Sequence, residues 1–364
     1  MMTVRVDGMI YFWCTLCISF LAVLGISHAT KDLCSKSFCK CPEAAKIVFC
    51  ECENELKKLD IIEGSLPKQT ESLSISQCGE VVLNTNAFKV NSGLKNLKLQ
   101  NLNRLDLHKN FFSLKETLYL EMNNFTLISI GELQTQTGSF RYFPKVSRVL
   151  IQEVGIRKVP EEGLEILTDH FILNDNNIGV LERSSLYSDA SNLTIIHNRI
   201  ERIESGAFDA SVRYFNFIEN TIDKVLNNGI SVAFQEGIIS KNIFTTQEGS
   251  PFRDVGPDPS CTADPESDYD GDDQIIYNIV ANPVLHFSQN TFLNFSDELL
   301  NFPGANNVPL GSLHIDKNIF KCDCESLMNF AILVDFDYVY SLSRLLMSRE
   351  TMFLGRKSTI QAFA

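Results

Sequence analysis

Cysteine is the residue type whose spacing most clearly implies chemistry in this chain. The 364 residues include 11 cysteines, and six of these lie between Cys34 and Cys78. Such a density is typical of proteins that fold in an oxidising compartment, where thiols form disulfides. A zinc site is the alternative, because a Cys-x-Cys spacing occurs there. The histidine ligands and the cytosolic context expected for zinc are missing, so we predict disulfides and no metal.

Catalytic motifs are not found in the sequence. No Gly-x-Ser-x-Gly, His-Glu-x-x-His, phosphate-binding loop or dinucleotide-binding motif occurs. The acidic run from Asp268 to Asp273 looks like a calcium loop, but Ile279 stands where glutamate is needed. We expect a solvated acidic loop there, with a weak surface calcium site as the alternative. The net charge of −13 argues against nucleic acid as a partner. The sequence therefore predicts a protein that is not an enzyme and uses no cofactor.

The first residues are arranged as a secretion signal. Arg5 precedes an apolar run over 9–26, and the small residues that signal peptidase reads follow at 27–29. We expect residues 1–29 to be removed, with an uncleaved anchor as the alternative. No later run matches that length without charges, so the mature protein is predicted to be secreted and to have no membrane span. Glycosylation sequons agree with this route at Asn124, Asn192 and Asn294.

A repeat with a period of 22 residues runs through the middle of the chain. Its frame is apolar-x-apolar-x-x-Asn, with the asparagine at Asn176, Asn198, Asn220 and Asn242. The two apolar residues face one side of a short strand, and the asparagine can satisfy buried backbone groups in the turn that follows. One repeat cannot bury its apolar face alone. We therefore expect successive turns of the coil, here called rungs, to stack into a continuous core.

The frame extends in both directions with less regular spacing, which gives about ten rungs. Further frames begin at Leu73, Leu97, Leu118, Val149, Leu285 and Leu313. The phase near Leu97 stays open, because a frame that begins at Leu105 also fits.

These rungs resemble the extracellular leucine-rich-repeat family, whose pattern is LxxLxLxxN, over roughly residues 72–324. The resemblance implies an α/β solenoid: a curved right-handed coil with a concave parallel β-sheet and a convex side of loops or short helices. The spacing Cys34-x4-Cys39-x-Cys41-x8-Cys50 resembles the N-terminal cap of that family. The cap implies disulfides Cys34–Cys41 and Cys39–Cys50, and it leaves Cys52 and Cys78 to pair with each other.

The predicted organisation is a signal peptide (1–29), a cysteine-rich cap (30–71), a solenoid (72–320) with insertions at 134–145 and 250–273, and a C-terminal segment (321–364). Residues 318–324 resemble the opening of a C-terminal cap, but the two later cysteines of such a cap are missing. The cap is therefore incomplete, divergent, or the product of a truncated or alternatively spliced message. Loss of Cys14 and Cys17 with the signal leaves nine of the 11 cysteines, an odd number that permits a disulfide-linked dimer. The pairing of Cys261, Cys322 and Cys324 stays open.

Binding is predicted on the outward side of the concave sheet. Outward positions of a solvated sheet are normally polar, but an apolar stripe occurs here at Tyr119, Leu150, Ile172, Ile196, Ile218 and Ile238. Contiguous exposed apolar surface commonly marks an interaction site, although glycans, a dimer partner or rung twist are alternatives that would cover it. His286 and His314 should project from the same sheet at neighbouring rungs, either as a pH-sensitive patch or half of a metal site, or as solvated surface histidines.

The leading functional hypothesis is a secreted protein that recognises another extracellular protein through this face. An accessory subunit of a secreted enzyme complex is the second hypothesis. It rests on the segment 41–52 and the weakly leucine-rich rungs, which resemble arthropod proteins named after the non-catalytic subunit of Oplophorus-luciferin 2-monooxygenase. A structural protein of the extracellular matrix, assembled through the unpaired cysteine, is the third.

Overall fold

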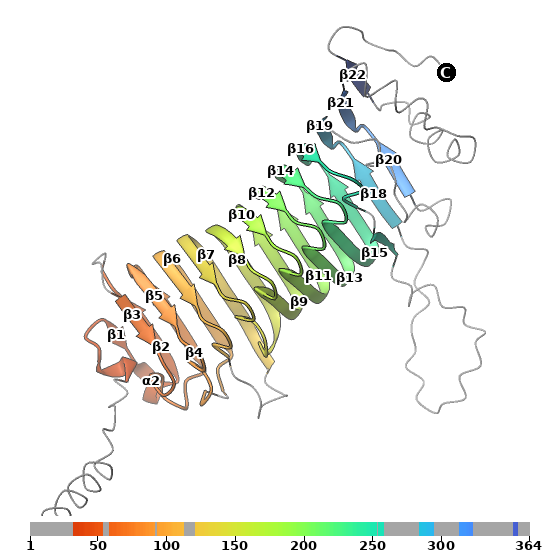
Figure 1. The fold of residues 1–364 in the computed structure, drawn as a ribbon. Coiled ribbons are helices and arrows are strands. Elements are labelled where there is room, and N and C mark those ends of the chain that lie inside the picture. The colour runs from red at the N-terminus through yellow and green to blue at the C-terminus, as the bar shows by residue number, and fades with distance from the viewer. Residues whose placement is uncertain are drawn as a thin grey trace, which may run out of the picture.

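The protein is an elongated parallel β-solenoid whose rungs stack along one axis (Figure 1). The structure is a computed structural model, and it describes residues 32–53, 58–91, 93–112, 121–252, 254–257, 284–294, 313–322 and 352–355. The predicted signal peptide lies outside the described residues.

The described elements are almost all strands. In chain order they are η1 (Leu33–Ser35), β1 (Cys39–Lys40), α2 (Pro42–Ala45), β2 (Ile47–Glu51), β3 (Lys58–Ile61), β4 (Ser72–Ser76), β5 (Glu80–Leu83), β6 (Asn96–Leu107), β7 (Glu121–Thr135), β8 (Lys145–Val159), β9 (Leu164–Asn174), β10 (Asn177–Leu181), β11 (Leu186–Ile196), β12 (Arg199–Ile203), β13 (Phe208–Ile218), β14 (Thr221–Val225), β15 (Ile230–Ser240), β16 (Ile243–Gln247), β17 (Asp254–Pro257), β18 (Val284–Ser288), β19 (Thr291–Asn294), β20 (Leu313–Asp316), β21 (Ile319–Cys322) and β22 (Met352–Gly355).

A central rung has three sides, and the rung formed by β11 and β12 shows why. Burial alternates with a period of two in the first half of β11, where Leu186, Ser188 and Ala190 point inward, and then shifts phase so that Leu193 and Ile195 are buried. A shift in a two-residue period means that the strand bends at a corner. We call the sheet formed by 186–190 and its equivalents sheet A, the sheet formed by 192–196 and its equivalents sheet B, and the sheet formed by β12 and its equivalents sheet C.

Neighbouring rungs pair in parallel, residue for residue. Sheet B runs from β2 through β4, β6, β7, β8, β9, β11, β13, β15 and β18 to β20. This confirms the predicted stacked coil with a leucine-rich-repeat-like frame. The loops or short helices expected outside the parallel sheet are represented in an early rung by the turns that follow β5. In the central rungs the segment before sheet B is a strand of sheet A instead, because alternating inward residues such as Leu186 and Ser188 favour a strand.

One predicted frame is wrong. Leu118 and Leu120 lie outside the described residues, and the place predicted for their rung in sheet B is taken by Phe125, which pairs with Leu97 and Val149. The true frame is Phe125-x-Leu127-x-x-Ile130, in which all three residues are buried and isoleucine takes the asparagine position. The frame at Leu97 is the one used in sheet B, since Leu97 pairs with Leu73.

A buried ladder of asparagines closes the corner between sheets B and C. Oδ1 of Asn198 accepts the backbone N–H of Asn176 at 3.0 Å and its Nδ2 at 2.9 Å. Nδ2 of Asn198 in turn donates to the carbonyl of Leu173 at 2.9 Å. The pattern repeats through Asn220, Asn242, Asn290 and Asn318, which confirms the role predicted for the repeated asparagine.

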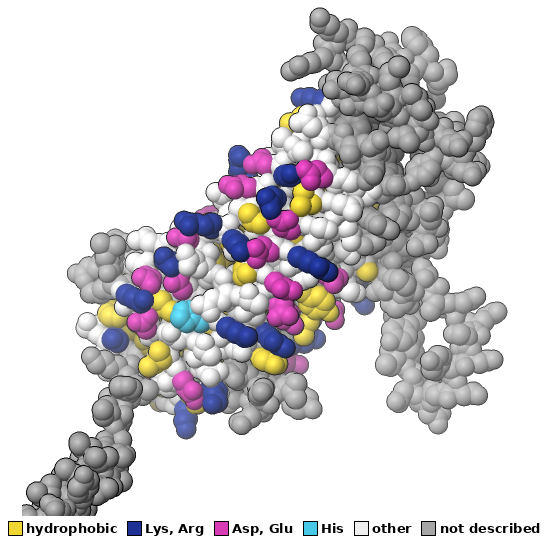
Figure 2. All heavy atoms as spheres, viewed as in Figure 1, with side chains coloured by type: hydrophobic (Ala, Val, Ile, Leu, Met, Phe, Trp, Pro, Cys, Tyr) yellow, Lys and Arg dark blue, Asp and Glu magenta, His cyan; other side chains and the backbone are white. Residues whose placement is uncertain are grey.

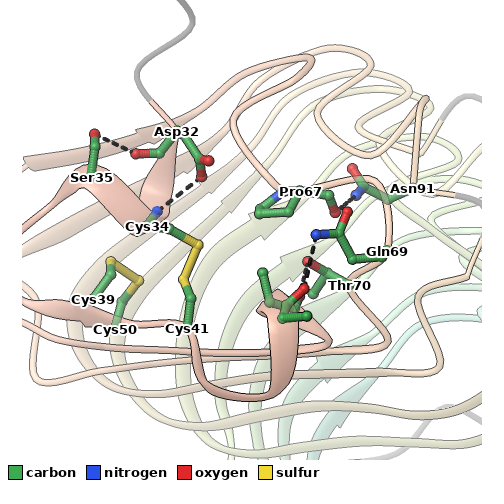
Figure 3. The surroundings of a disulfide bond; sticks show 12 residues. Asp32, Cys34, Ser35, Cys39, Cys41, Cys50, Pro67, Gln69, Thr70 and Asn91 are labelled. Carbon is green, nitrogen blue, oxygen red and sulfur yellow. Dashed lines mark hydrogen bonds between the residues drawn. A yellow bond between two sulfur atoms is a disulfide. The ribbon is translucent and has the colours of Figure 1, made fainter.

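Three disulfides cap the N-terminal end of the solenoid. They join Cys34 to Cys41, Cys39 to Cys50 and Cys52 to Cys78, which is the pairing expected from the cap resemblance. Figure 3 shows the first two beside Asp32, whose carboxylate accepts the backbone N–H of Cys34 at 3.0 Å. The cap covers apolar side chains that the first rung would otherwise expose.

The two predicted insertions differ in how they meet the core. Residues 134–145 form the end of β7, an extended turn and the start of β8, and the turn places Phe140 and Phe143 in the core within 5.8 Å and 5.0 Å of the ring of Phe125. In the second insertion, residues 254–257 still continue the rung, because β17 pairs with β15. Sheet B resumes at Val284, and the predicted insertion beyond Pro257 lies outside the described residues.

Candidate functional site

The outward surface of sheet B carries three straight columns of side chains. One of them, next to sheet A, consists of Arg148, His170, Asn192, Tyr214 and Glu236. The predicted stripe lies in the other two, which we call the first and second columns. The strand register aligns Leu150, Ile172, Thr194, Asn216 and Ile238 in the first column. It aligns Gln152, Asn174, Ile196, Ile218 and Ser240 in the second. Neighbouring members of a column lie about 4.8 Å apart, and the columns are about 7 Å apart along the strands.

The structure brings five of the six predicted stripe residues together in these columns. Leu150 lies beside Ile172, and Ile196 lies beside Ile218. Each of the five is half-buried, so part of each side chain is open to solvent. Tyr119 lies outside the described residues, and Thr126 occupies the column position between Lys98 and Leu150. From here on, the stripe means Leu150, Ile172, Ile196, Ile218 and Ile238.

The two columns that hold the stripe are uncharged, whereas the column beside them carries Arg148 and Glu236 on the first and last of these rungs. Neither column carries a charged residue on the five rungs from Leu150 to Ile238, although 21% of the chain is charged. A patch of this kind can be desolvated by a partner at low cost, because no charge has to leave water.

A charged ladder follows the corner next to the stripe, and we call it the corner ladder: Asp175, His197, Glu219 and Lys241. Each residue has a positive φ, between 53° and 57°, in the turn that precedes a ladder asparagine. His197 lies 3.8 Å from Asp175 and 2.8 Å from Glu219, and Lys241 lies 2.9 Å from Glu219. The hydrogen bonds from Lys241 and then His197 lower the pKa of Glu219 below its usual value. The corner ladder thus borders the uncharged columns with a polar, internally paired edge.

Two sequons lie on sheet B at the opposite edge from the corner ladder. Asn192 pairs with His170 and Tyr214 in the register, two residues before the first column, and its Nδ2 lies 2.9 Å from Nδ1 of His170. Asn124 occupies the same position on its own rung and is exposed. A glycan at Asn192 would therefore project beside the stripe. Asn294 is exposed at the end of β19, on sheet C.

His286 and His314 are adjacent on sheet B, as the sequence predicted. They pair in the register, and their rings stack with centroids 4.6 Å apart and planes 10° apart. Among the described residues, no group of three or more His, Cys, Asp or Glu side chains is placed to hold a metal ion.

Sheet A was missed by the sequence analysis. Its outward side carries Leu167 and Tyr187, which are 45% and 42% exposed and rank among the most exposed large hydrophobic side chains described. The alternation of buried and exposed residues in 186–190 was the available signal. It was hidden because two of the three inward residues, Ser188 and Ala190, are small rather than large and apolar.

Comparisons with known proteins give little beyond the fold. No family model matches the chain, and no curated protein matches it. Among solved structures, the crystal structure of human 5T4 (Wnt-activated inhibitory factor 1, trophoblast glycoprotein) is similar over 84% of this chain and 86% of that chain, with 13% identity and a TM-score of 0.27. The strand register and the asparagine ladder define the solenoid of this chain.

No helix in the described part of the chain combines the length and apolar character needed to cross a bilayer.

Proposed function

We propose that this protein is a secreted, non-enzymatic recognition protein that binds another extracellular protein through the stripe on sheet B. The observation that carries the proposal is the uncharged patch, in which five half-exposed apolar residues lie in two aligned columns. A contiguous exposed apolar surface is uncommon unless it contacts a partner. That this sheet is the concave side of the coil stays a prediction.

The scaffold suits such a role because it holds the side chains in fixed positions. The columns lie on strands whose corner is closed by the asparagine ladder. Because the backbone is already held in place, little conformational freedom is lost when a partner binds. The corner ladder supplies a polar rim on one side, as interfaces commonly have around an apolar centre. The disulfide cap supports an extracellular location, because such bonds persist in oxidising compartments.

The test is a pair of matched double variants. Ile172→Asp with Ile196→Asp adds two charges to the stripe on neighbouring rungs. Asn177→Asp with Ser205→Asp adds the same two charges to the same rungs, at exposed positions away from sheet B. Proteins from the native extracellular fluid that wild type and the control variant retain should be lost by the stripe variant, and both variants should unfold at similar temperatures.

Equal capture by the stripe variant and the control would contradict the proposal. The identity of the captured protein separates the remaining hypotheses. A recurrent oxidoreductase would indicate an accessory subunit, a cell-surface protein would indicate recognition, and multimers sensitive to reducing agent would indicate a matrix protein.

A further inference from the structure

The outward side of sheet A presents a compact group of acidic and apolar side chains, which we call the sheet A patch: Glu165, Leu167, Tyr187, Asp189 and Asp209. Glu165, Tyr187 and Asp209 are aligned in one column on three successive rungs. Leu167 and Asp189 are neighbours in the next column. Tyr187 is therefore flanked on both sides by a carboxylate about 4.8 Å away between strand backbones, and by a third about 7 Å along its own strand.

The three carboxylates of the patch form no ion pair, although Arg141 lies near enough to Glu165 to act on its charge. Among the described residues no ion pair or side-chain hydrogen bond involves Glu165, Asp189 or Asp209. The sheet A strand segments 164–168, 186–190, 208–212 and 230–234 contain no lysine or arginine. Sheet C differs, because Lys158 pairs with Glu182 and Arg199 pairs with Asp223. Asp189 and Asp209 are thus left without an ion-pair partner on sheet A, beside exposed apolar groups.

The surroundings of Glu165 also favour the approach of a cation. Burial, and then the nearby charge of Glu162, raise the pKa of Glu165 above its usual value, against a smaller opposing effect of Arg141. A carboxylate that is partly removed from water near a like charge gains from any cation that approaches it. The exposed side chains of Leu167 and Tyr187 offer apolar contact area to the molecule that carries this cation.

We propose that the sheet A patch is a second docking surface, which binds an extended Lys- or Arg-bearing segment of a partner protein. Arginine pairs with carboxylates through two parallel hydrogen bonds, and either cation is attracted to the face of a tyrosine ring. Side chains on one face of an extended peptide recur about every 7 Å, which matches the separation of the two columns. Leu167 provides an apolar contact in the second of these columns, beside Asp189.

Charge favours a basic peptide segment over an acidic partner or a second copy of this chain as the occupant of the sheet A patch. The chain carries a net charge of −13, so a basic partner is attracted over a long range and an acidic one is repelled. A second copy of this chain would bring another acidic patch and is disfavoured for the same reason. The proposal is independent of the stripe, which lies on a different sheet.

The test uses a synthetic peptide with arginine at alternate positions, separated by valine and threonine, and the full mature protein. Binding is measured by fluorescence anisotropy at two salt concentrations. A peptide of the same composition with its arginines consecutive is the sequence control. The patch variant combines Glu165→Gln, Asp189→Asn and Asp209→Asn, and the matched control combines Glu182→Gln, Glu201→Gln and Asp223→Asn, which remove the same charge from the other side.

We expect the patch variant to bind the alternating peptide about tenfold or more weakly, and Tyr187→Ala to bind several-fold more weakly. The matched control and the stripe variant Ile172→Asp with Ile196→Asp should stay within about twofold of wild type, because neither alters the patch. If the triple variant folds poorly, the single variant Asp189→Lys tests the same point, because Asp189 is exposed. It should also bind the alternating peptide more weakly than wild type.

Three results would overturn the proposal. The first is equal weakening by the two triple variants, which would mean that only net charge matters. The second is equal affinity for the alternating and consecutive peptides. The third is no measurable binding by wild type at low salt. Loss of capture by the stripe variant with intact peptide binding would leave both surfaces supported, so the two proposals fail separately.

Discussion

Replacing one ladder asparagine should destabilise the solenoid far more than replacing an asparagine on its surface. Asn220 is 1% exposed. Its Oδ1 accepts the backbone N–H of Asn198 at 2.9 Å, and its Nδ2 donates to the carbonyl of Ile195 at 2.9 Å. In Asn220→Ala both backbone groups lose this partner where water does not reach. Each buried group left unsatisfied costs about 1–3 kcal/mol, so the loss is about 2–6 kcal/mol.

The matched control lies on the same rung. Asn216 is half-buried on sheet B, and its Nδ2 makes only a long contact of 3.5 Å with Oγ1 of Thr194. Asn216→Ala should therefore cost about 0.5 kcal/mol or less. Urea denaturation followed by far-UV circular dichroism compares the two variants, and hydrogen exchange at the amide of Asn198 shows whether the loss is local.

A third variant separates hydrogen bonding from packing. Asn220→Asp keeps the shape and the oxygen that accepts from Asn198, but it places a second oxygen against the carbonyl of Ile195 and buries a charge. It should be no more stable than Asn220→Ala at neutral pH and should recover part of the loss in acid. If Asn220→Ala and Asn216→Ala unfold within about 0.5 kcal/mol of each other, the ladder is not what closes this corner.

Three further outcomes follow from single sites. Gln247 is 4% exposed with both side-chain polar atoms unpaired, so Gln247→Leu should raise the free energy of unfolding by about 1–3 kcal/mol, while Thr246→Leu beside it should not. Because the folded-state pKa of Glu165 is raised, its ionised carboxylate destabilises the fold at pH values above its ordinary pKa. Glu165→Gln should therefore raise the melting temperature slightly at pH 7 and leave it unchanged at pH 3. An equal gain at both pH values would mean that ionisation of Glu165 is not the reason. The disulfide between Cys52 and Cys78 closes a separation of 26 residues, so replacing both by serine should cost about 2–4 kcal/mol and speed proteolysis of the cap, and unchanged proteolysis would mean that the cap is held by packing alone.

The repeat was predictable from sequence where one rung satisfies several constraints at once. From Phe171 to Asn242 the apolar pair, the asparagine and the two later apolar residues all recur at 22 residues, and the structure stacks them in register. Near Leu118 the same pattern occurs by chance, and the true frame at Phe125 lacks asparagine. Upstream rungs do without the ladder because β7 and β8 stay paired through that corner, at Ile130 and Val154.

The candidate surfaces were predictable to different degrees. The positions of Ile172 and Ile196 follow from simple alternation within a recognised frame, so their outward direction was correctly assigned. Sheet A was not anticipated, since a convex side of loops or short helices gives no reason to read Glu165, Tyr187 and Asp209 as one column. Only the register between rungs brings these residues together, because they are 22 residues apart in sequence.

Ion pairs across neighbouring rungs distinguish sheet C from sheets A and B, the two sheets proposed to bind partners. On sheet C, Arg199 meets Asp223 and Lys158 meets Glu182 across neighbouring rungs, so a partner docking there must first break existing pairs. On sheet B the two stripe columns have no charge to desolvate, and on sheet A the carboxylates have no ion pair to break. Because the solenoid repeats each strand position at every rung, each sheet has its own kind of surface. The three sheets therefore differ in the free energy that a partner loses by breaking ion pairs or desolvating charges. Charge-changing substitutions should therefore alter recognition on sheets A and B and leave it unchanged on sheet C.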